Sequence, residues 1–204
     1  MLTAVILAAG RARRMGTLKQ LLPWQQGRTM LETVVHTVLA CPEVDDEVRV
    51  VLGAGREQTR AVLADIQDAR LRLLENPHPS RGMLSSIQIG VENLPAASRG
   101  FLVYLGDQPL IQSDLVRKLA KSWRSSPTDF LIPVYQRRRG HPVLVHSKYV
   151  PEILAMEDAD GGLRSLIRRH SERVQTLPVD SAEIHIDLDY PDEYRKYRPG
   201  GGGE

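Results

Sequence analysis

The sequence predicts a three-layer α/β/α fold around a mostly parallel sheet. Short aliphatic runs, of lengths that suit buried strands, recur at residues 2–8, 47–53, 71–76, 100–106 and 129–134. Between most of them lie segments in which apolar residues recur with a helical period. Because strand and helix alternate along the chain, we expect parallel strands with helices on both faces of the sheet.

The predicted helices have recognisable boundaries. Residues 29–40 place Leu31, Val34, Val35 and Val38 on one face, and Thr29 precedes them as a cap. Similar patterns predict helices within residues 56–66, 83–94 and 113–123.

The pattern changes after Pro133. We predict a hairpin that turns near Gly140, helices at about residues 147–156 and 162–170, and two short strands at residues 173–179 and 183–188. These elements form a small C-terminal lobe that continues the sheet. We expect one domain over residues 1–197, followed by a disordered tail over residues 198–204, where four glycines and no large apolar side chain occur.

Composition excludes several classes of protein. The chain has 204 residues, a net charge of +2 and one cysteine, Cys41, so one chain can form neither an internal disulfide nor a thiolate metal cluster. No long apolar segment predicts a membrane span, and the near-neutral charge gives no reason to expect nucleic acid as a partner. The amino-terminal residues lack the pattern of a secretory signal, and we expect a cytoplasmic protein.

The first loop, "LAAGRARRMGTLKQLLP" (residues 7–23), combines glycines with basic residues. Its spacing matches neither the GxGxxG dinucleotide fingerprint nor the Walker A motif. Gly10 would let the backbone approach a phosphate, and Arg14 and Lys19 would neutralise a triphosphate. The residues alone fit a solvated basic loop equally well.

Carboxylates follow at two further places. Asp107 stands at the end of the run 100–106, where it could hold Mg²⁺ against substrate phosphates, although turn aspartates are common. Asp187 and Asp189 alternate with apolar residues and would share one face of an extended segment, either as further magnesium ligands or as the wet side of an edge strand.

Basic residues precede Gly140. Arg137, Arg138 and Arg139 fit a solvated hairpin tip or a site for an anionic second substrate. His78 and His141 are isolated from other residues at metal-ligand spacing.

Together these motifs resemble the MobA-like nucleotidyltransferases. The first loop is similar to that family's LAAGxxxRMGxxKxLLP signature, and "NPHPSRGMLSSIQIGV", "LGDQPLI", "RRGHPVLV" and "DLDYPDEY" are similar to further family segments in the same order. The resemblance covers nearly the whole chain and is strongest to the molybdenum cofactor cytidylyltransferases. It implies a Rossmann-like nucleotidyltransferase sheet and transfer of CMP from CTP to molybdopterin, with release of pyrophosphate.

The resemblance also implies residue roles. Arg14, Lys19 and Asp107 would be catalytic, and Asp107 would bind Mg²⁺ with Asp187 or Asp189. The nucleotide would be held by Ala8, Ala9, Gly10, Arg14, Lys19, Gly82, Ser85 and Ser86. The acceptor would contact Arg139, Gly140, His141 and Pro142. Guanine-using relatives read LAGG in the first motif, so Ala9 favours cytosine. A molybdoenzyme or a cofactor-insertion chaperone would receive the product.

Three alternatives remain open. The first is transfer of another nucleotide, or transfer to another phosphorylated acceptor. The second is a non-catalytic cofactor-maturation factor, which would not need a carboxylate placed for a metal. The third is a nicotinamide-binding domain, which the glycine spacing disfavours.

Overall fold

An eight-stranded sheet forms the centre of the computed structural model, which describes residues 1–10, 18–157 and 160–200. The order is β10-β7-β9-β6-β1-β4-β5, and β8 pairs with β7. The strands are β1 (Leu2–Ala8), β4 (Val48–Leu52), β5 (Leu71–Glu75), β6 (Gly100–Leu105), β7 (Phe130–Tyr135), β8 (Arg138–Arg139), β9 (Val143–His146) and β10 (Val174–Pro178). A separate hairpin joins β2 (Pro23–Gln25) to β3 (Arg28–Thr29).

The sheet is mostly parallel, as predicted. β1 pairs in parallel with both β4 and β6, β4 with β5, and β10 with β7. The antiparallel pairs involve β8 or β9. The carboxyl ends of β1, β4, β5 and β6 therefore meet at one edge, where ligands bind in open α/β sheets.

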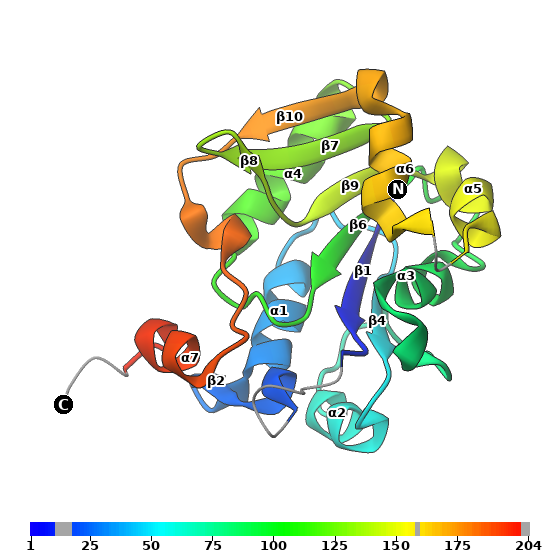
Figure 1. Cartoon of the computed structure of the whole chain (residues 1–204). Helices are drawn as coiled ribbons and strands as arrows, with labels where there is room; N and C mark the ends of the chain where they lie inside the picture. The colour runs from blue at the N-terminus through cyan, green and yellow to red at the C-terminus, as the bar shows by residue number, and fades with distance from the viewer. Residues whose placement is uncertain (11–17, 158–159, 201–204) are drawn as a thin grey trace.

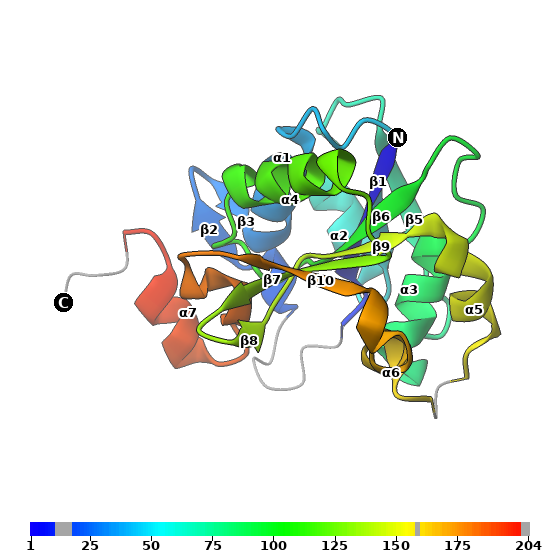
Figure 2. The same ribbon diagram turned by 90° about the horizontal axis from the view of Figure 1, so that it is seen from above.

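Helices cover both faces of this sheet (Figures 1 and 2). One face packs against α1 (Met30–Leu39), α2 (Arg56–Leu63) and α4 (Ser113–Ser125). The other packs against α3 (Met83–Val91), α5 (Val150–Ala155) and α6 (Gly162–Arg169). The predicted three-layer α/β/α arrangement is confirmed.

The sequence of β1 explains why it lies in the middle. Leu2, Ala4 and Ile6 belong to the core beside α1, whereas Val5 belongs to the core beside α3. Successive side chains point to opposite faces of a strand, so a strand covered on both sides must be apolar at nearly every position.

The predicted cap of the first helix is present. Thr29 Oγ1 accepts a hydrogen bond from Glu32 N at 3.2 Å, and Glu32 Oε2 accepts one from Thr29 N at 2.7 Å. This capping box satisfies two backbone donors at the start of α1.

Two local predictions in the C-terminal lobe are wrong. The hairpin turns at Gln136 and Arg137, both of which have positive φ (46° and 66°), and Gly140 lies beyond β8. Residues 183–188 do not form a strand. Residues Ala182–His185 form a 3₁₀ helix, and Ile184 packs against Gly140. The apolar alternation there reflects anchoring contacts rather than sheet pairing.

Residues 181–198, which we call the C-terminal strap, run from the region after β10 to α7 (Pro191–Tyr197), beside β2 (Figure 1). The Tyr194 hydroxyl donates a hydrogen bond to the Pro23 carbonyl, and the rings of Tyr194 and Trp24 lie 6.1 Å apart. The far end of the strap is therefore fixed to the β2–β3 hairpin.

Some predictions concern residues outside the described part of the chain. Arg14 lies in residues 11–17, and the end of the predicted disordered tail lies in residues 201–204. Within the described residues, no helix is both long and apolar enough to cross a membrane.

Candidate active site

The candidate site lies at the carboxyl edge of the sheet, where the loop after β6 meets the end of β1. Gly106 N donates a hydrogen bond to Leu7 O at 3.0 Å, and a methyl group added at Gly106 would lie 2.9 Å from that oxygen. Ala9 is buried, and a methyl group added at Gly53 would lie 2.7 Å from its Cβ. The backbone segments are packed too closely to accept larger residues at these glycines.

Lys19 forms the centre of the site. Its Nζ forms ion pairs with both Asp107 Oδ2 and Asp189 Oδ1. Lys19 follows the first loop, Asp107 follows β6, and Asp189 belongs to the strap, so three distant segments meet at one ammonium group. The structure therefore brings together Lys19, Asp107 and Asp189, which the sequence analysis selected.

The neighbouring charges alter the ionisation of the cluster. Burial by itself disfavours the ammonium, but Asp107 and Asp189 outweigh it and raise the pKa of Lys19 above its ordinary value. Burial raises the pKa of Asp187, and Asp107 and Asp189 add to this effect. Lys19 thus stays positively charged while facing several carboxylates.

Gln108 has a function in this arrangement that the sequence analysis did not assign. Its Nε2 donates a hydrogen bond to Asp187 Oδ1 at 2.8 Å, and its side chain is almost fully buried. Its Oε1 is buried without a hydrogen-bond partner among the described residues. This buried amide holds Asp187 toward the cluster. In the sequence, the only sign of this role is that Gln108 directly follows Asp107.

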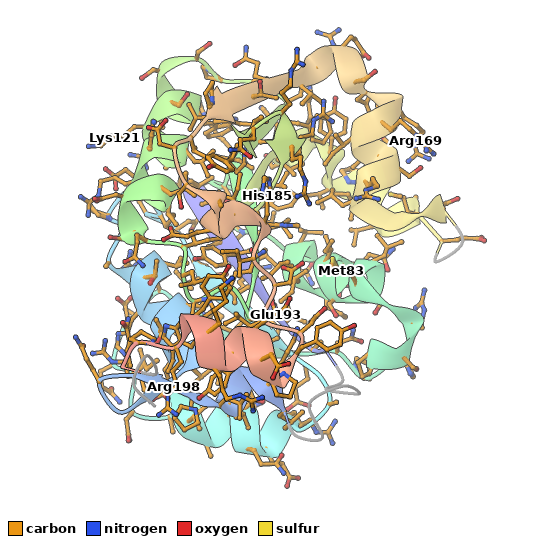
Figure 3. All side chains as sticks on the ribbon, turned by 60° about the vertical axis from the view of Figure 1, so that its left-hand side comes forward. Met83, Lys121, Arg169, His185, Glu193 and Arg198 are labelled. Carbon is orange, nitrogen blue, oxygen red and sulfur yellow. The ribbon has the colours of Figure 1, made fainter. Side chains whose placement is uncertain are left out.

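Glu193 fixes the other strap carboxylate. Glu193 Oε2 accepts hydrogen bonds from the backbone N–H groups of Asp189 at 3.1 Å and Tyr190 at 3.2 Å. Figure 3 shows Glu193 on α7. The start of α7 therefore sets the position of Asp189 beside Lys19.

The carboxylates around Lys19 show whether this site could hold a divalent metal ion. In the described part of the chain, no group of three or more histidine, cysteine or acidic side chains is arranged to hold a metal by itself. Asp107 and Asp189 nevertheless share one cation, the Lys19 ammonium. Magnesium usually binds one or two carboxylates together with substrate phosphates and water, so this donor set fits Mg²⁺ when a nucleotide supplies the remaining oxygens.

The loop after β5 contributes a second wall. Ser85 and Ser86 are buried, and both hydroxyls lie 2.9 Å from Asn76 Nδ2. Gly82 has φ 102°, and no described residue lies within 4 Å of a methyl group added there. The two serines hold the loop through Asn76, which the sequence analysis did not select. Gly82 is exposed. Nucleotide contacts of these three residues stay a prediction.

A cavity of about 990 Å³ lies next to the cluster. Gly82 and Met83 from the start of α3, Arg139, Gly140 and His141 from the β8–β9 segment, and residues of α6 line it. Figure 3 shows Met83 at the start of α3. Its volume is at the upper end of the range for small-molecule sites.

His141 connects this cavity with the cluster. It lines the cavity, and its side chain interacts electrostatically with Asp107. Its backbone N–H donates a hydrogen bond to Ile184 O at 3.3 Å. Burial lowers the pKa of His141 despite that carboxylate, so its imidazole is neutral at physiological pH. Pro142, joined to His141 by a cis peptide bond, is not among the residues that line the cavity.

Two curated relatives cover most of this chain. The molybdenum cofactor cytidylyltransferase of Escherichia coli K12 is 26% identical over 93% of this chain and 92% of its own length. The nicotine blue oxidoreductase of Paenarthrobacter nicotinovorans is 31% identical over 92% and 91%, respectively. The two relatives therefore carry different named activities.

A solved structure shows the same fold. Rv0371c from Mycobacterium tuberculosis H37Rv has a TM-score of 0.76 and 26% identity, covering 96% of this chain and 95% of its own. Its complex with manganese has a TM-score of 0.70 and 25% identity, covering 96% of both chains.

Residues 4–174 match the family described as the MobA-like NTP transferase domain. This region contains Lys19, Asp107 and all the described residues that line the cavity, whereas the strap with Asp187 and Asp189 follows it. Since the match spans most of the 204 residues, the chain belongs to the MobA-like NTP transferase family.

Proposed function

We propose that this protein transfers CMP from CTP to a molybdopterin-type acceptor and releases pyrophosphate. The observation that carries the proposal is the Lys19 ammonium held between Asp107 and Asp189, at the sheet edge and beside a cavity lined by arginines. The cytidylyltransferase relative supports CTP and molybdopterin as the substrates.

The reaction needs no covalent enzyme intermediate. A phosphate oxygen of the acceptor attacks the α-phosphorus of CTP, a new P–O bond forms, and the bond to the β-phosphate breaks as pyrophosphate leaves with the electron pair. Lys19 and Arg14 neutralise the charge that develops on the leaving group. The protein contributes mainly by holding both substrates in line.

The carboxylates have a separate function. Asp107, with Asp187 or Asp189, would hold Mg²⁺, which when bound supplies charge neutralisation at the triphosphate. The manganese complex of Rv0371c supports a divalent ion in this fold. Gln108 keeps Asp187 directed toward the same place.

The acceptor occupies the cavity in this proposal. Arg139, Gly140 and His141 line it, and no acidic side chain is among its described lining residues. An anionic acceptor therefore meets positive charge without a competing carboxylate. His141, between the cavity and Asp107, lies where the two substrates must meet.

Pyrophosphate release tests the proposal. The purified protein is mixed with Mg²⁺, molybdopterin and, separately, CTP, GTP, ATP or UTP. We expect release with CTP and its loss in Asp107→Ala. Asp114→Ala is a matched control, because the side chain of Asp114 is 89% exposed on α4. Release with another nucleotide would change the base preference and keep the mechanism.

Two other results would replace the proposal. Binding of molybdopterin without pyrophosphate release from any nucleotide would favour a maturation factor that only binds the cofactor. The 31% identical oxidoreductase makes hydride transfer a second candidate. Consumption of NADH or NADPH with an organic acceptor, unaffected by Asp107→Ala, would support that candidate instead.

The Gly10→Ala variant tests where the phosphates bind. Among the described residues, nothing lies within 4 Å of a methyl group added at Gly10, so we expect an unchanged melting temperature. If the triphosphate fills that space, its affinity should fall about tenfold, because a phosphate close to the backbone leaves no room for Cβ. Calorimetric titration with CTP measures this change, and unchanged affinity would place the phosphates elsewhere.

A further inference from the structure

Among the described residues, six arginines line the cavity; Arg81 comes just before α3, and the other five form two groups. Arg137, Arg138 and Arg139 belong to the β7–β8 hairpin, and Arg164 and Arg168 belong to α6. Figure 2 shows β8, which pairs with β7, and α6 apart from each other. The cavity therefore has positive charge on two separate walls.

In the described part of the chain, no nearby carboxylate accounts for the arginine pair on α6. Arg164 and Arg168 are four positions apart, so they share one face of the helix, where two like charges destabilise it. Among the described residues, no ion pair joins either guanidinium to a carboxylate. The nearby Asp160 is engaged by the backbone of Glu157, at 2.7 Å, and does not line the cavity.

The next arginine on α6 shows the contrast. Arg169 forms an ion pair with Glu152 on α5 at 3.1 Å and does not line the cavity. Figure 3 shows Arg169 on α6. On α6, the arginine that faces α5 thus has an ion pair, whereas in the described part of the chain neither of the two that line the cavity has one.

Backbone groups add to the positive potential of the same wall. α3 and α6 begin at Gly82 and Gly161, neither of which supplies a side-chain cap. A methyl group added at Gly162 would lie 4.0 Å from Leu84 Cβ, so the first turns of the two helices are neighbours. Their amino-terminal N–H groups reinforce the charges of Arg164 and Arg168.

The floor between the two arginine groups is apolar. Val103, Ile132 and Val143 come from β6, β7 and β9, and Ile87 and Ile167 come from α3 and α6. Such a floor suits a flat ring system, while arginines suit carboxylates and phosphates. A ligand that uses the whole cavity has anionic groups at both ends of a largely apolar body.

We propose that Arg164 and Arg168, with the starts of α3 and α6, form a second anion subsite, and that the acceptor carries two anionic groups held on opposite walls. This inference rests on the proposed function, because it assumes that the acceptor occupies this cavity. It adds that the hairpin arginines are not the only positive charges that bind the acceptor.

Two simple probes test the subsite without nucleotide or turnover. Naphthalene-2-sulfonate carries one anionic group on a flat body, and naphthalene-2,6-disulfonate carries two at opposite ends. We expect the disulfonate to bind the full-length protein at least tenfold more tightly in a calorimetric titration at low salt. Equal affinities, or no binding of either probe, would overturn the proposal.

Paired variants locate the effect. Arg164→Gln/Arg168→Gln keeps most of each apolar stem and should abolish the preference for the disulfonate, as should Arg138→Gln/Arg139→Gln at the hairpin. Arg169→Gln should keep the preference. Retention of the preference in the α6 double variant, or its loss in Arg169→Gln, would also overturn the subsite. Because the titration needs no catalysis, failure of pyrophosphate release would leave its result readable.

Discussion

Replacing Lys19 with methionine is expected to lower kcat for pyrophosphate release by about 10²- to 10³-fold, as removal of one preorganised charge-stabilising group does elsewhere. Lys19 is the cation shared by Asp107 and Asp189. Without it, the leaving pyrophosphate loses a positive partner. The carboxylates, including Asp187, which already has a raised pKa, lose the charge that offsets their repulsion.

Two controls make this result specific. Lys121→Met removes a lysine whose side chain is 66% exposed on α4 and should leave kcat unchanged. Lys19→Arg keeps the charge with a different geometry and should recover part of the rate. Steady-state kinetics with calorimetric titration of CTP separate turnover from binding. A Lys19→Met enzyme with wild-type kcat would contradict the catalytic assignment.

Replacing Gly140 with alanine is expected to disturb both the acceptor side and the strap. The added methyl group would lie 2.5 Å from Ile184 O and 2.7 Å from Ile184 Cβ. Since backbone atoms cannot move aside as a flexible side chain can, the strap must shift, and the bond from His141 N to Ile184 O is lost. We expect a loss of about 1–3 kcal/mol in unfolding free energy, typical of overpacking.

The same shift should reach the carboxylates. Ile184 precedes Asp187 by three positions and Asp189 by five, so we expect kcat to fall about tenfold at a temperature where the variant is fully folded. Gly27→Ala is a stability control. Gly27 has φ 74°, and no residue that the structure describes lies within 4 Å of a methyl group added there, so alanine costs about 1–2 kcal/mol through its backbone conformation. It should retain kcat. Denaturant unfolding and initial rates measure both effects, and a Gly140→Ala protein with unchanged stability and rate would refute the coupling.

The strap illustrates where sequence patterns mislead. The alternation of Ile184, Ile186 and Leu188 predicts a strand, but β10 already pairs with β7 at that end of the sheet. Ile184 instead packs on Gly140, and Leu188 packs in the small core with Trp24. The sequence pattern identified the buried apolar positions correctly, but not the residues that they pack against.

By itself, the sequence determined the layered α/β/α fold and the cap of α1, and it selected Lys19, Asp107, Asp187 and Asp189 as candidate site residues. These depend on periodicity, on residues a few positions apart, and on motifs in single loops. The tertiary structure alone decided that Lys19 meets Asp189 across 170 positions, that Gln108 holds Asp187, and that α6 faces the hairpin across one cavity. Contacts between distant segments depend on how whole elements pack, which no local pattern encodes.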